Sequence, residues 1–299
     1  FVPNEGQHEL LDKLSRFVVS SDRQKAFILL GYAGTGKTSI IAALVQAYKE
    51  LQQKIVLLAP TGRAAKVISR YASTPAYTIH KYIYRQKQLG EAVFTLNDNL
   101  HKNTLFIVDE ASMISGVRDN TMFGSGTLLD DLVKYVYSGE GCSMLLLGDD
   151  AQLPPVGSLI SPALQSDYMQ KYGLHVTCSI LTEVARQAMD SGILRNASKI
   201  RPVALGEGQI PHSTWDLLEE SSDFIHITGA EVSEKLEQSY NEVGVEEVML
   251  LTRTNKRTNI YNQGIRTRIL WREEEIENGD RLMVSKNNYF WTEKYENLP

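Results

Sequence analysis

The sequence predicts an α/β fold built around a parallel sheet, and three features of the chain support this class. Short apolar runs alternate with segments of helical period, which is the pattern of strands joined by helical crossovers. The runs contain almost no polar residue, as expected of strands that are buried on both faces. The first run leads directly into a glycine-rich loop and then a helix. The four runs are 26–30, 55–59, 104–108 and 143–148.

The length of 299 residues and the composition indicate a globular protein with two domains. Hydrophobic residues make up 42% of the chain, and no uninterrupted apolar window of about 18 residues could span a membrane. We expect the first domain to cover 1–200 and the second 201–299. The two cysteines, Cys142 and Cys178, indicate reduced thiols of a cytoplasmic protein. Because the chain starts with neither Met nor a signal peptide, we interpret it as an excised segment.

Charge is unevenly distributed along the chain. The formal net charge is −5, which argues against general adhesion to nucleic acid. Residues 54–102 nevertheless contain eight basic and two acidic side chains, an excess of +6 that leaves −11 for the remainder. A basic strip on an acidic body is typical of directed binding to a polyanion, and a solvated helix face is the alternative interpretation.

The glycine-rich loop after the first strand matches a phosphate-binding pattern. Gly31, Gly36, Lys37 and Thr38 have the spacing of the phosphate loop. Glycines let successive backbone N–H groups curl around phosphate oxygens, and the helix expected at 37–51 points its positive end at the same anion. We expect Lys37 to reach the β- and γ-phosphates and Thr38 to bind Mg²⁺. The alternative is a glycine-rich turn before a core helix.

Helical period over residues 7–19 predicts a helix before the first strand. Gln7 lies near its start, where its amide could both donate to and accept from one edge of adenine, although a glutamine there is more often exposed. After the second strand, residues 60–63 form a turn that precedes another helix. Residues 82–98 predict two short strands around a turn at Gly90, a hairpin that stands off the sheet.

The rest of the chain continues the alternation. A polar, glycine-rich loop is expected at 116–126, a helix at 128–137 and a helix that ends near 199. Beyond residue 200 a second series of strands and helices begins, which predicts another α/β unit. Its expected elements are strand 223–228, helix 232–240, strand 247–252, helix 255–270 and a strand at 279–285.

Acidic, amide and basic side chains follow the later strands, at the edge where a parallel sheet gathers its ligands. Asp109 is placed to hold Mg²⁺, and Glu110 to orient and deprotonate an attacking water. Gln152, just beyond the fourth run, could hydrogen-bond a γ-phosphate. Arg186 could neutralise charge on that phosphate as an arginine finger in cis, although such an arginine alone is more often a surface ion-pair residue.

Ordered blocks of residues resemble the superfamily-one DNA helicases of the 5′→3′ branch, the group around RecD (the exonuclease V alpha-subunit type) and the phage helicase Dda. The order and spacing of the blocks carry this resemblance, which covers nearly the whole chain. The blocks are Gln7, Gly31–Thr38, Ala59–Lys66, Thr78–His80, Asp109–Ser112, Gly148–Val156, Leu181–Gln187, and Thr254–Asn255 with Asn262 and Arg266.

The resemblance implies a RecA-like parallel-sheet motor domain with a small β-hairpin insertion at about 82–99, followed by the first part of a second RecA-like domain. It implies ATP and Mg²⁺ as cofactors. Its partners would be single-stranded DNA and duplex junctions, with recombination or repair subunits, and no membrane. The hairpin lies where the family carries a wedge domain, and we hypothesise that it helps to part a duplex. A plain surface hairpin is the alternative.

The resemblance also implies roles for individual residues. Nucleotide would be bound by Gln7, Gly34, Thr35, Gly36, Lys37, Thr38 and Ser39, and the metal by Thr38 and Asp109. Catalysis would involve Lys37, Glu110, Gln152 and Arg186. The DNA strand would be contacted by Thr61, Gly62, Lys66, Thr78, His80, Thr254 and Asn255. Small hydroxyls and backbone amides grip sugar and phosphate without reading sequence, whereas a histidine such as His80 is by itself more often structural.

We therefore expect an ATP-dependent DNA helicase, in which hydrolysis drives 5′→3′ translocation on single-stranded DNA and duplex unwinding. Two alternatives stay open: a nucleotide-gated module that binds or loads single-stranded DNA without unwinding, and a phosphate-loop enzyme that acts on a small molecule or RNA. The family's last two motifs are absent from the sequence, so we interpret the chain as C-terminally truncated. We expect it to bind nucleotide, hydrolyse it poorly and not translocate.

Overall fold

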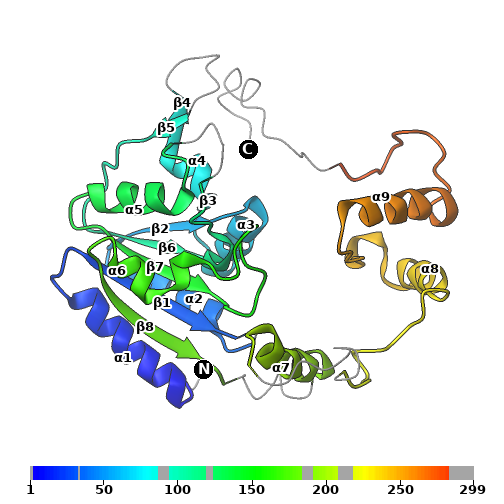
Figure 1. Cartoon of the computed structure of the whole chain (residues 1–299), viewed down its shortest axis with the longest axis horizontal. Coiled ribbons are helices and arrows are strands. Elements are labelled where there is room, and N and C mark those ends of the chain that lie inside the picture. Colours follow the sequence, from blue (N-terminus) through cyan, green and yellow to red (C-terminus); the bar gives the residue numbers. More distant parts are fainter. Residues whose placement is uncertain are drawn as a thin grey trace. The chain divides into compact units, whose positions relative to one another are not determined.

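A six-stranded parallel sheet forms the centre of the first part of the chain (Figure 1). The computed structural model describes residues 3–32, 34–86, 94–118, 124–183, 191–207 and 218–282. The strand order is β3-β2-β6-β7-β1-β8, and every neighbouring pair is parallel. The strands are β1 (Lys25–Gly31), β2 (Lys54–Ala59), β3 (Ala76–Thr78), β6 (Thr104–Val108), β7 (Ser143–Gly148) and β8 (His175–Leu181).

The four predicted strands are confirmed as β1, β2, β6 and β7, which form the middle of the sheet. Their burial explains the apolar runs, since all residues of β6 and β7 are buried. The outer strands β3 and β8 were not predicted from the sequence. β3 has only three residues, and β8, at one edge of the sheet, buries only Ser179 and Leu181, so neither forms an apolar run.

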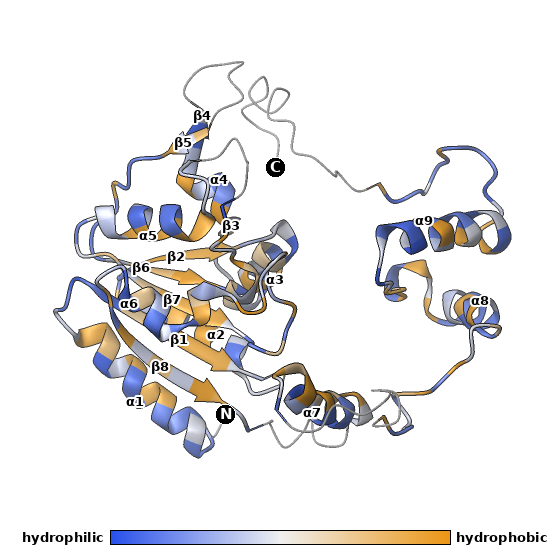
Figure 2. Ribbon diagram, in the orientation of Figure 1, coloured by the Kyte–Doolittle hydropathy of each residue, from blue (hydrophilic) through white to orange (hydrophobic). Residues whose placement is uncertain are grey.

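Helices cover both faces of the sheet (Figure 2). Successive residues of the strands belong to opposite clusters, because side chains alternate between the two faces of a sheet. In β1, Phe27 and Leu29 pack with α1 (Glu5–Val19), α2 (Lys37–Glu50) and α3 (Gly62–Ala72). Ala26 and Ile28 pack on the other face with α4 (Ile79–Ile83), α5 (Leu128–Ser138) and α6 (Ser166–Gln170). Two 3₁₀ turns, Ala111–Met113 and Pro162–Leu164, belong to that second layer.

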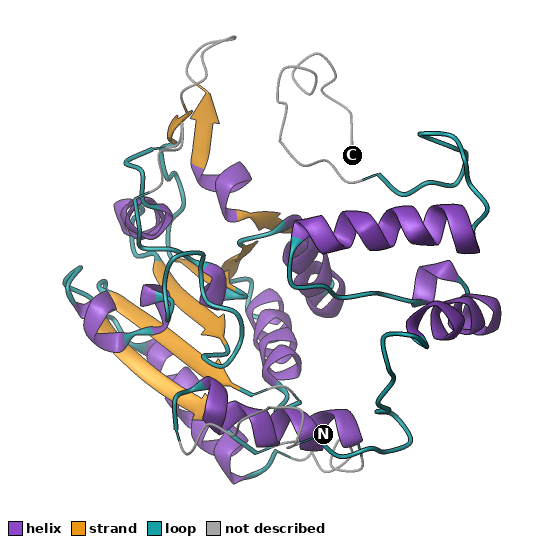
Figure 3. Cartoon of the chain, turned by 45° about the vertical axis from the view of Figure 1, so that its right-hand side comes forward, coloured by secondary structure: helices purple, strands orange, loops and turns teal. Residues whose placement is uncertain are grey.

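The strands all end at the same edge of the sheet (Figure 3). The loops after β1, β2, β6 and β7 therefore share one rim, as the alternation of strands and helices predicted. β7 lies between β1 and β6, so the loop after β7 separates the phosphate loop from the two acids that follow β6.

The predicted hairpin is confirmed as β4 (Tyr84–Gln86) paired antiparallel with β5 (Phe94–Leu96). Its expected turn at Gly90 lies outside the described residues. The Tyr84 hydroxyl donates to Asp131 of α5 at 2.8 Å, and Arg85 pairs with Asp98 at 3.0 Å. The base of the hairpin is thus joined to the helical layer over the sheet.

The chain forms two compact units, residues 1–219 and residues 220–299. We had expected a boundary near residue 200. The helix α7 (Gly192–Ala204) stays with the first unit because Arg201 pairs with Asp149, at the end of β7. No helix among the described residues is both long and apolar enough to cross a lipid bilayer.

Two α-helices are the main regular elements of the second unit among its described residues. α8 (Val232–Val243) and α9 (Asn255–Gly264), which continues as a π-helix over Ile265–Ile269, confirm the predicted helices. The predicted strands at 223–228 and 247–252 are wrong: the first is limited to one bridge between Ser221 and Phe224, and the second is a 3₁₀ turn (Val245–Glu247) followed by irregular chain. A strand needs a hydrogen-bonded neighbour along its length, and within residues 218–282 no pairing longer than that single bridge forms.

The strand expected at 279–285 does not begin within the described residues 279–282, and its remainder lies outside them.

Candidate nucleotide-binding site

The phosphate loop joins the end of β1 to the start of α2, and glycine is needed at three of its positions. Gly34 and Gly36 have φ angles of 75° and 85°, in the left-handed region that other residues rarely adopt. A Cβ atom on Gly31 would lie 2.7 Å from the Lys37 side chain. The loop can therefore fold closely over its own lysine only because these positions lack side chains.

Lys37 lies at the centre of the charged groups of this rim. Its amine donates to the carbonyl oxygens of Gly31 and Tyr32, the latter at 3.1 Å. Burial lowers the pKa of Lys37, whereas the carboxylates of Asp149, Glu110 and Asp109 oppose that shift. Three strands thus bring the loop lysine within electrostatic reach of three acids.

Asp109 and Glu110 follow β6 and are both partly desolvated. Burial raises the pKa of each carboxyl, and the charge of Asp109 raises the pKa of Glu110 further. Asp109 accepts a hydrogen bond from the backbone N–H of Glu110 at 3.0 Å. Glu110 has a φ angle of 53°, a left-handed conformation that costs a non-glycine residue about 1–3 kcal/mol. This strained turn directs the acid after the strand away from the regular strand path.

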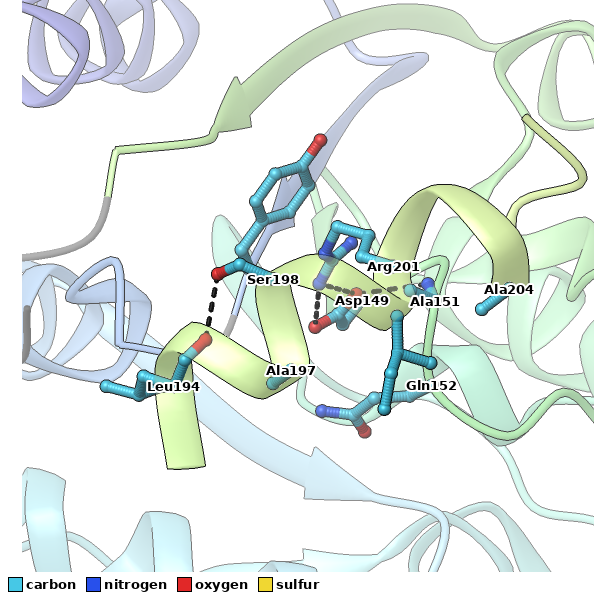
Figure 4. A pocket seen from close by; sticks show the side chains of 10 residues that line it. Asp149, Ala151, Gln152, Leu194, Ala197, Ser198, Arg201 and Ala204 are labelled. Atoms are coloured by element: carbon cyan, nitrogen blue, oxygen red, sulfur yellow. Dashed lines mark hydrogen bonds and ion pairs between the residues drawn. The ribbon is translucent and has the colours of Figure 1, made fainter. Parts of the chain in front are cut away.

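Asp149, directly after β7, is almost fully buried and is held by Arg201 of α7 (Figure 4). The Arg201 Nη2 atom lies 2.6 and 2.7 Å from the two Asp149 carboxylate oxygens, and Nη1 lies 3.2 Å from Asp150. The guanidinium carbon lies 3.5 Å from the centroid of the Tyr32 ring, a cation–π contact. Arg201 thus connects the strand β7, the phosphate loop and α7.

Gln152 lies at a turn that Asp149 shapes. The Asp149 carboxylate accepts from the N–H of Ala151 at 3.0 Å, and its carbonyl accepts from the N–H of Gln152 at 3.2 Å. A cavity of about 310 Å³ opens between this turn and α7. Its lining consists of Tyr32, Asp149, Ala151, Gln152, Leu194, Ala197, Ser198, Ile200, Arg201 and Ala204 (Figure 4).

Gln7 is buried rather than exposed, which corrects the interpretation of that residue alone as a surface glutamine. Its side-chain amide donates to the carbonyl of Thr35 at 3.0 Å and accepts from the N–H of Asn4 at 3.1 Å, while Asn4 caps the start of α1. Thr35 is itself buried and donates its hydroxyl to Tyr32. Gln7 therefore fixes the phosphate loop, and its amide retains a second N–H donor for a base.

The residues expected to hold the metal fit a hard cation through their oxygen atoms. Thr38 is exposed at the start of α2, and Asp109 follows β6 on the same rim, with β7 between β6 and β1. Within the described part of the chain, no group of three or more His, Cys, Asp or Glu side chains forms a closed metal cage. An open pair of oxygen ligands suits Mg²⁺, which usually keeps several waters and binds phosphates as well.

A groove at the same rim brings together two of the residues that were expected to contact DNA. Thr61 and His80 line a cavity of about 350 Å³ that also includes Met113 and Val156. The Thr61 hydroxyl accepts from the N–H of Ala64, so its own proton can still be donated to a ligand. The remaining lining residues are Pro60, Tyr84, Ser115, Val117, Gly126, Leu128 and Pro155.

The other expected DNA contacts lie in different places. A Cβ on Gly62 would meet nothing within 4 Å, and Lys66 is exposed on α3. Thr78 caps α4 by accepting from the N–H of Lys81. The second unit contains Thr254, which caps α9, and Asn255, which begins that helix.

Arg186 lies outside the described residues, and Ser39 is exposed beside Thr38. No role for Tyr32, Asp149 or Arg201 is predicted from the sequence, although Asp149 follows a buried strand just as Asp109 does. That shared position was the available signal, whereas nothing in the local sequence connects Arg201 with it.

Comparisons with known proteins identify the family to which the chain is similar. A family model described as an AAA domain matches residues 3–227. The chain is 30% identical to the uncharacterized protein R530 of Acanthamoeba polyphaga mimivirus, over 96% of this chain and 60% of that protein. It is 28% identical to the ATP-dependent RecD2 DNA helicase of Deinococcus radiodurans, over 65% of this chain and 23% of that protein.

Two further similarities concern a phage protein and a solved structure. The chain is 27% identical to the ATP-dependent DNA helicase dda of Enterobacteria phage T4, over 61% of this chain and 39% of that protein. The crystal structure of Pif1 helicase from Candida albicans aligns with a TM-score of 0.47 at 17% identity, over 88% of this chain and 61% of that one. The chain spans less than two thirds of the length of each of these proteins.

Proposed function

We propose that this chain, which belongs to the AAA-domain family whose model matches residues 3–227, is the ATP-hydrolysing motor of a RecD/Dda-like DNA helicase. Membership of this family implies nucleotide binding, and two of its relatives are named ATP-dependent DNA helicases. We propose that hydrolysis drives 5′→3′ movement along single-stranded DNA and opens duplex junctions, and that recombination or repair subunits are further partners.

One observation carries the proposal: a phosphate loop with opposed acids and a groove lined by Thr61 and His80 lie on the same rim of one sheet. The carboxylates of Asp109 and Glu110 act electrostatically on the pKa of Lys37, although they follow a different strand from the phosphate loop. The adjacent groove contains hydroxyl and ring groups suited to a sugar–phosphate strand and its bases. A motor needs this adjacency, because hydrolysis must change the grip on the polymer.

Within the nucleotide site, each side chain has a distinct task. Lys37 and the loop N–H groups would bind the β- and γ-phosphates. Glu110, whose pKa is raised by burial and by Asp109, is suited to accept a proton from water. Thr38 and Asp109 would hold Mg²⁺, which when bound neutralises phosphate charge. We propose that Gln152 orients toward the γ-phosphate, that Arg186 stabilises its charge and that Gln7 reads adenine.

DNA would be gripped without reading its sequence. Thr61 and Thr78 hold helix N-termini through their hydroxyl oxygens and can still donate protons to phosphates. Gly62 leaves room for a close approach of the strand, and Lys66 adds positive charge. We propose that His80 packs against a base, that Thr254 and Asn255 also touch the strand, and that the hairpin β4–β5 helps to part the duplex.

The test measures ATP turnover with and without single-stranded DNA in a protein that contains this chain and covers the full length of its relatives, because we expect the chain by itself to hydrolyse ATP poorly. We expect Lys37→Ala to abolish the DNA-stimulated turnover, whereas Lys49→Ala on the exposed side of the same helix should keep it within about twofold, the range of an ordinary surface substitution. Duplexes with 5′ or 3′ tails then test the direction of movement. Equal turnover of Lys37→Ala and the unmodified protein would contradict the proposal. ATP-dependent retention of DNA without strand displacement would favour a nucleotide-gated module that loads single-stranded DNA. Stimulation of turnover by RNA alone would favour a phosphate-loop enzyme that acts on RNA.

A further inference from the structure

The buried pair of Asp149 and Arg201 lies beside the phosphate loop, and the functions proposed so far give it no task. The side chain of Asp149 is 4% exposed and that of Arg201 is 13% exposed. Two short contacts join the Arg201 Nη2 atom to both carboxylate oxygens of Asp149. Arg201 also covers the ring of Tyr32, whose carbonyl accepts from the Lys37 amine. The pair and the loop lysine therefore share one small region.

Asp149 would compete with a nucleotide for Lys37 if its charge were not balanced. A buried carboxylate is destabilised unless a cation or several hydrogen-bond donors compensate it. Leu30 of β1 pairs with Gly148 of β7, so Asp149 follows β7 beside Gly31, whose carbonyl accepts from the Lys37 amine. An unbalanced carboxylate here would hold the Lys37 ammonium and would also repel phosphate oxygens.

We propose that Arg201 is a positioning residue that neutralises Asp149, so that Lys37 is available to the phosphates and the anion is not repelled. This inference rests on the proposed nucleotide-binding function. Arginine suits the task better than lysine because its planar guanidinium can hold two carboxylate oxygens while it stacks on an aromatic ring. Asp149 in turn shapes the turn that carries Gln152, so the acid is retained despite its charge.

The test is a titration of the protein with a fluorescent ATP analogue, in which the dissociation constant is measured for a set of variants. We expect Arg201→Met to weaken binding by about tenfold or more, the effect of one uncompensated charge close to the phosphates. The double variant Asp149→Asn with Arg201→Met should bind within about threefold of the unmodified protein, because it has no charge to neutralise. Asparagine still offers an oxygen to the Ala151 N–H.

Lys199→Met is the matched control. It removes a cation from the same helix, and that lysine pairs with the exposed carboxylate of Glu219 in a surface ion pair. It should leave the dissociation constant unchanged. A merely structural role for Arg201 predicts that the double variant binds as weakly as Arg201→Met, and this result would overturn the proposal. Unchanged binding by Arg201→Met would overturn it as well.

One further variant, Asp149→Asn, and the binding of the unmodified protein decide the remaining outcomes. If Arg201→Met does not fold, Asp149→Asn alone decides: binding as tight as that of the unmodified protein, or tighter, supports the inference, and binding about tenfold weaker overturns it. If the unmodified protein binds no nucleotide while it is folded, the proposed function itself fails. If the unmodified protein binds nucleotide tightly but the double variant binds as weakly as Arg201→Met, only the role of Arg201 is refuted.

Discussion

At the scale of single residues, the acids of the site are held in an environment that opposes their charge. Burial raises the pKa of Glu110 above its ordinary value of 4.5, and Asp109 raises it further. In the unfolded chain both carboxyls are hydrated and ionise normally at neutral pH. Folding therefore desolvates two neighbouring charges, a cost that a structural residue would not need and that a general base can use.

The first prediction concerns Glu110→Gln and the pH dependence of stability. A carboxyl whose folded-state pKa is raised contributes its full stability below its unfolded-state pKa, and this contribution is lost as pH rises through the raised folded-state value. Without Mg²⁺ and nucleotide, Glu110→Gln should therefore have a higher Tm than the unmodified protein at neutral pH. The advantage should shrink as pH falls toward 4.5. Turnover should fall by about 10²–10⁴-fold, as for loss of a general base.

Thermal melting at a series of pH values measures this difference in Tm. Glu140→Gln is the control, because the pKa of Glu140 is shifted in the opposite direction. The pKa of Glu140 is lowered by its hydrogen bond and ion pair with Lys102, so removing its charge should not raise the Tm at neutral pH. A Tm of Glu110→Gln below that of the unmodified protein at neutral pH would refute the argument.

At the scale of elements, the phosphate loop and the hairpin are both positioned by contacts from other parts of the chain. Gln7 of α1 reaches the loop at Thr35, a contact between residues 28 apart. Tyr84 at the start of β4 donates to Asp131 of α5, which also accepts from the N–H of Ser125 at 2.9 Å. Because Tyr84 belongs to this buried network, a deletion that tests the wedge hypothesis should spare it.

The second prediction is that Tyr84→Phe destabilises the first unit. Asp131 is buried, and loss of one of its donors should lower the free energy of unfolding by about 1–3 kcal/mol. Chemical denaturation measures this difference. Tyr71→Phe is the matched control, because the Tyr71 side chain is exposed on α3 and should change stability by less than about 0.5 kcal/mol. Equal stabilities of the two variants would show that the Tyr84 hydroxyl does not support the hairpin.

At the scale of the whole molecule, the two units differ in how much of their chain is buried. Both hydrophobic clusters consist of residues that precede 182, one on each face of the sheet. None of the described residues 220–282 is buried. The described nucleotide-site residues also precede the boundary at 219. Cooperative unfolding should therefore be dominated by the first unit.

The third prediction is that residues 1–219 alone bind nucleotide within about threefold of the whole chain, a difference of less than 1 kcal/mol. Their main thermal transition should stay at nearly the same temperature, because the sheet and both of its helical layers are retained. Titration with the fluorescent ATP analogue and calorimetry provide the measurements.

A shorter chain of residues 1–200 is the informative comparison, because it lacks Arg201 and the end of α7. If Arg201 neutralises Asp149, this chain should bind nucleotide more weakly than residues 1–219. Loss of binding by both shortened chains would show that residues beyond 219 complete the nucleotide site.

The sequence by itself determined the strands that are buried on both faces and the side chains that directly follow them. Continuous apolar runs mark such strands without knowledge of their neighbours, and phosphate-loop spacing is local, so Lys37 and Thr38 could be identified from the sequence, as could Asp109 and Glu110 after their strand. The edge strand β8 was not predicted, and the strands predicted beyond residue 220 do not form. In both cases strand formation depends on a neighbouring strand rather than on composition.

Only the tertiary structure decided which distant groups balance the charge of the site. Arg201 meets Asp149 across 52 residues, and Gln7 meets Thr35 across 28. Burial and pairing of a charge are properties of the packed molecule, because they depend on which side chains exclude water around it. No local pattern encodes such a neighbour, whereas strand burial and loop geometry are encoded within a few residues.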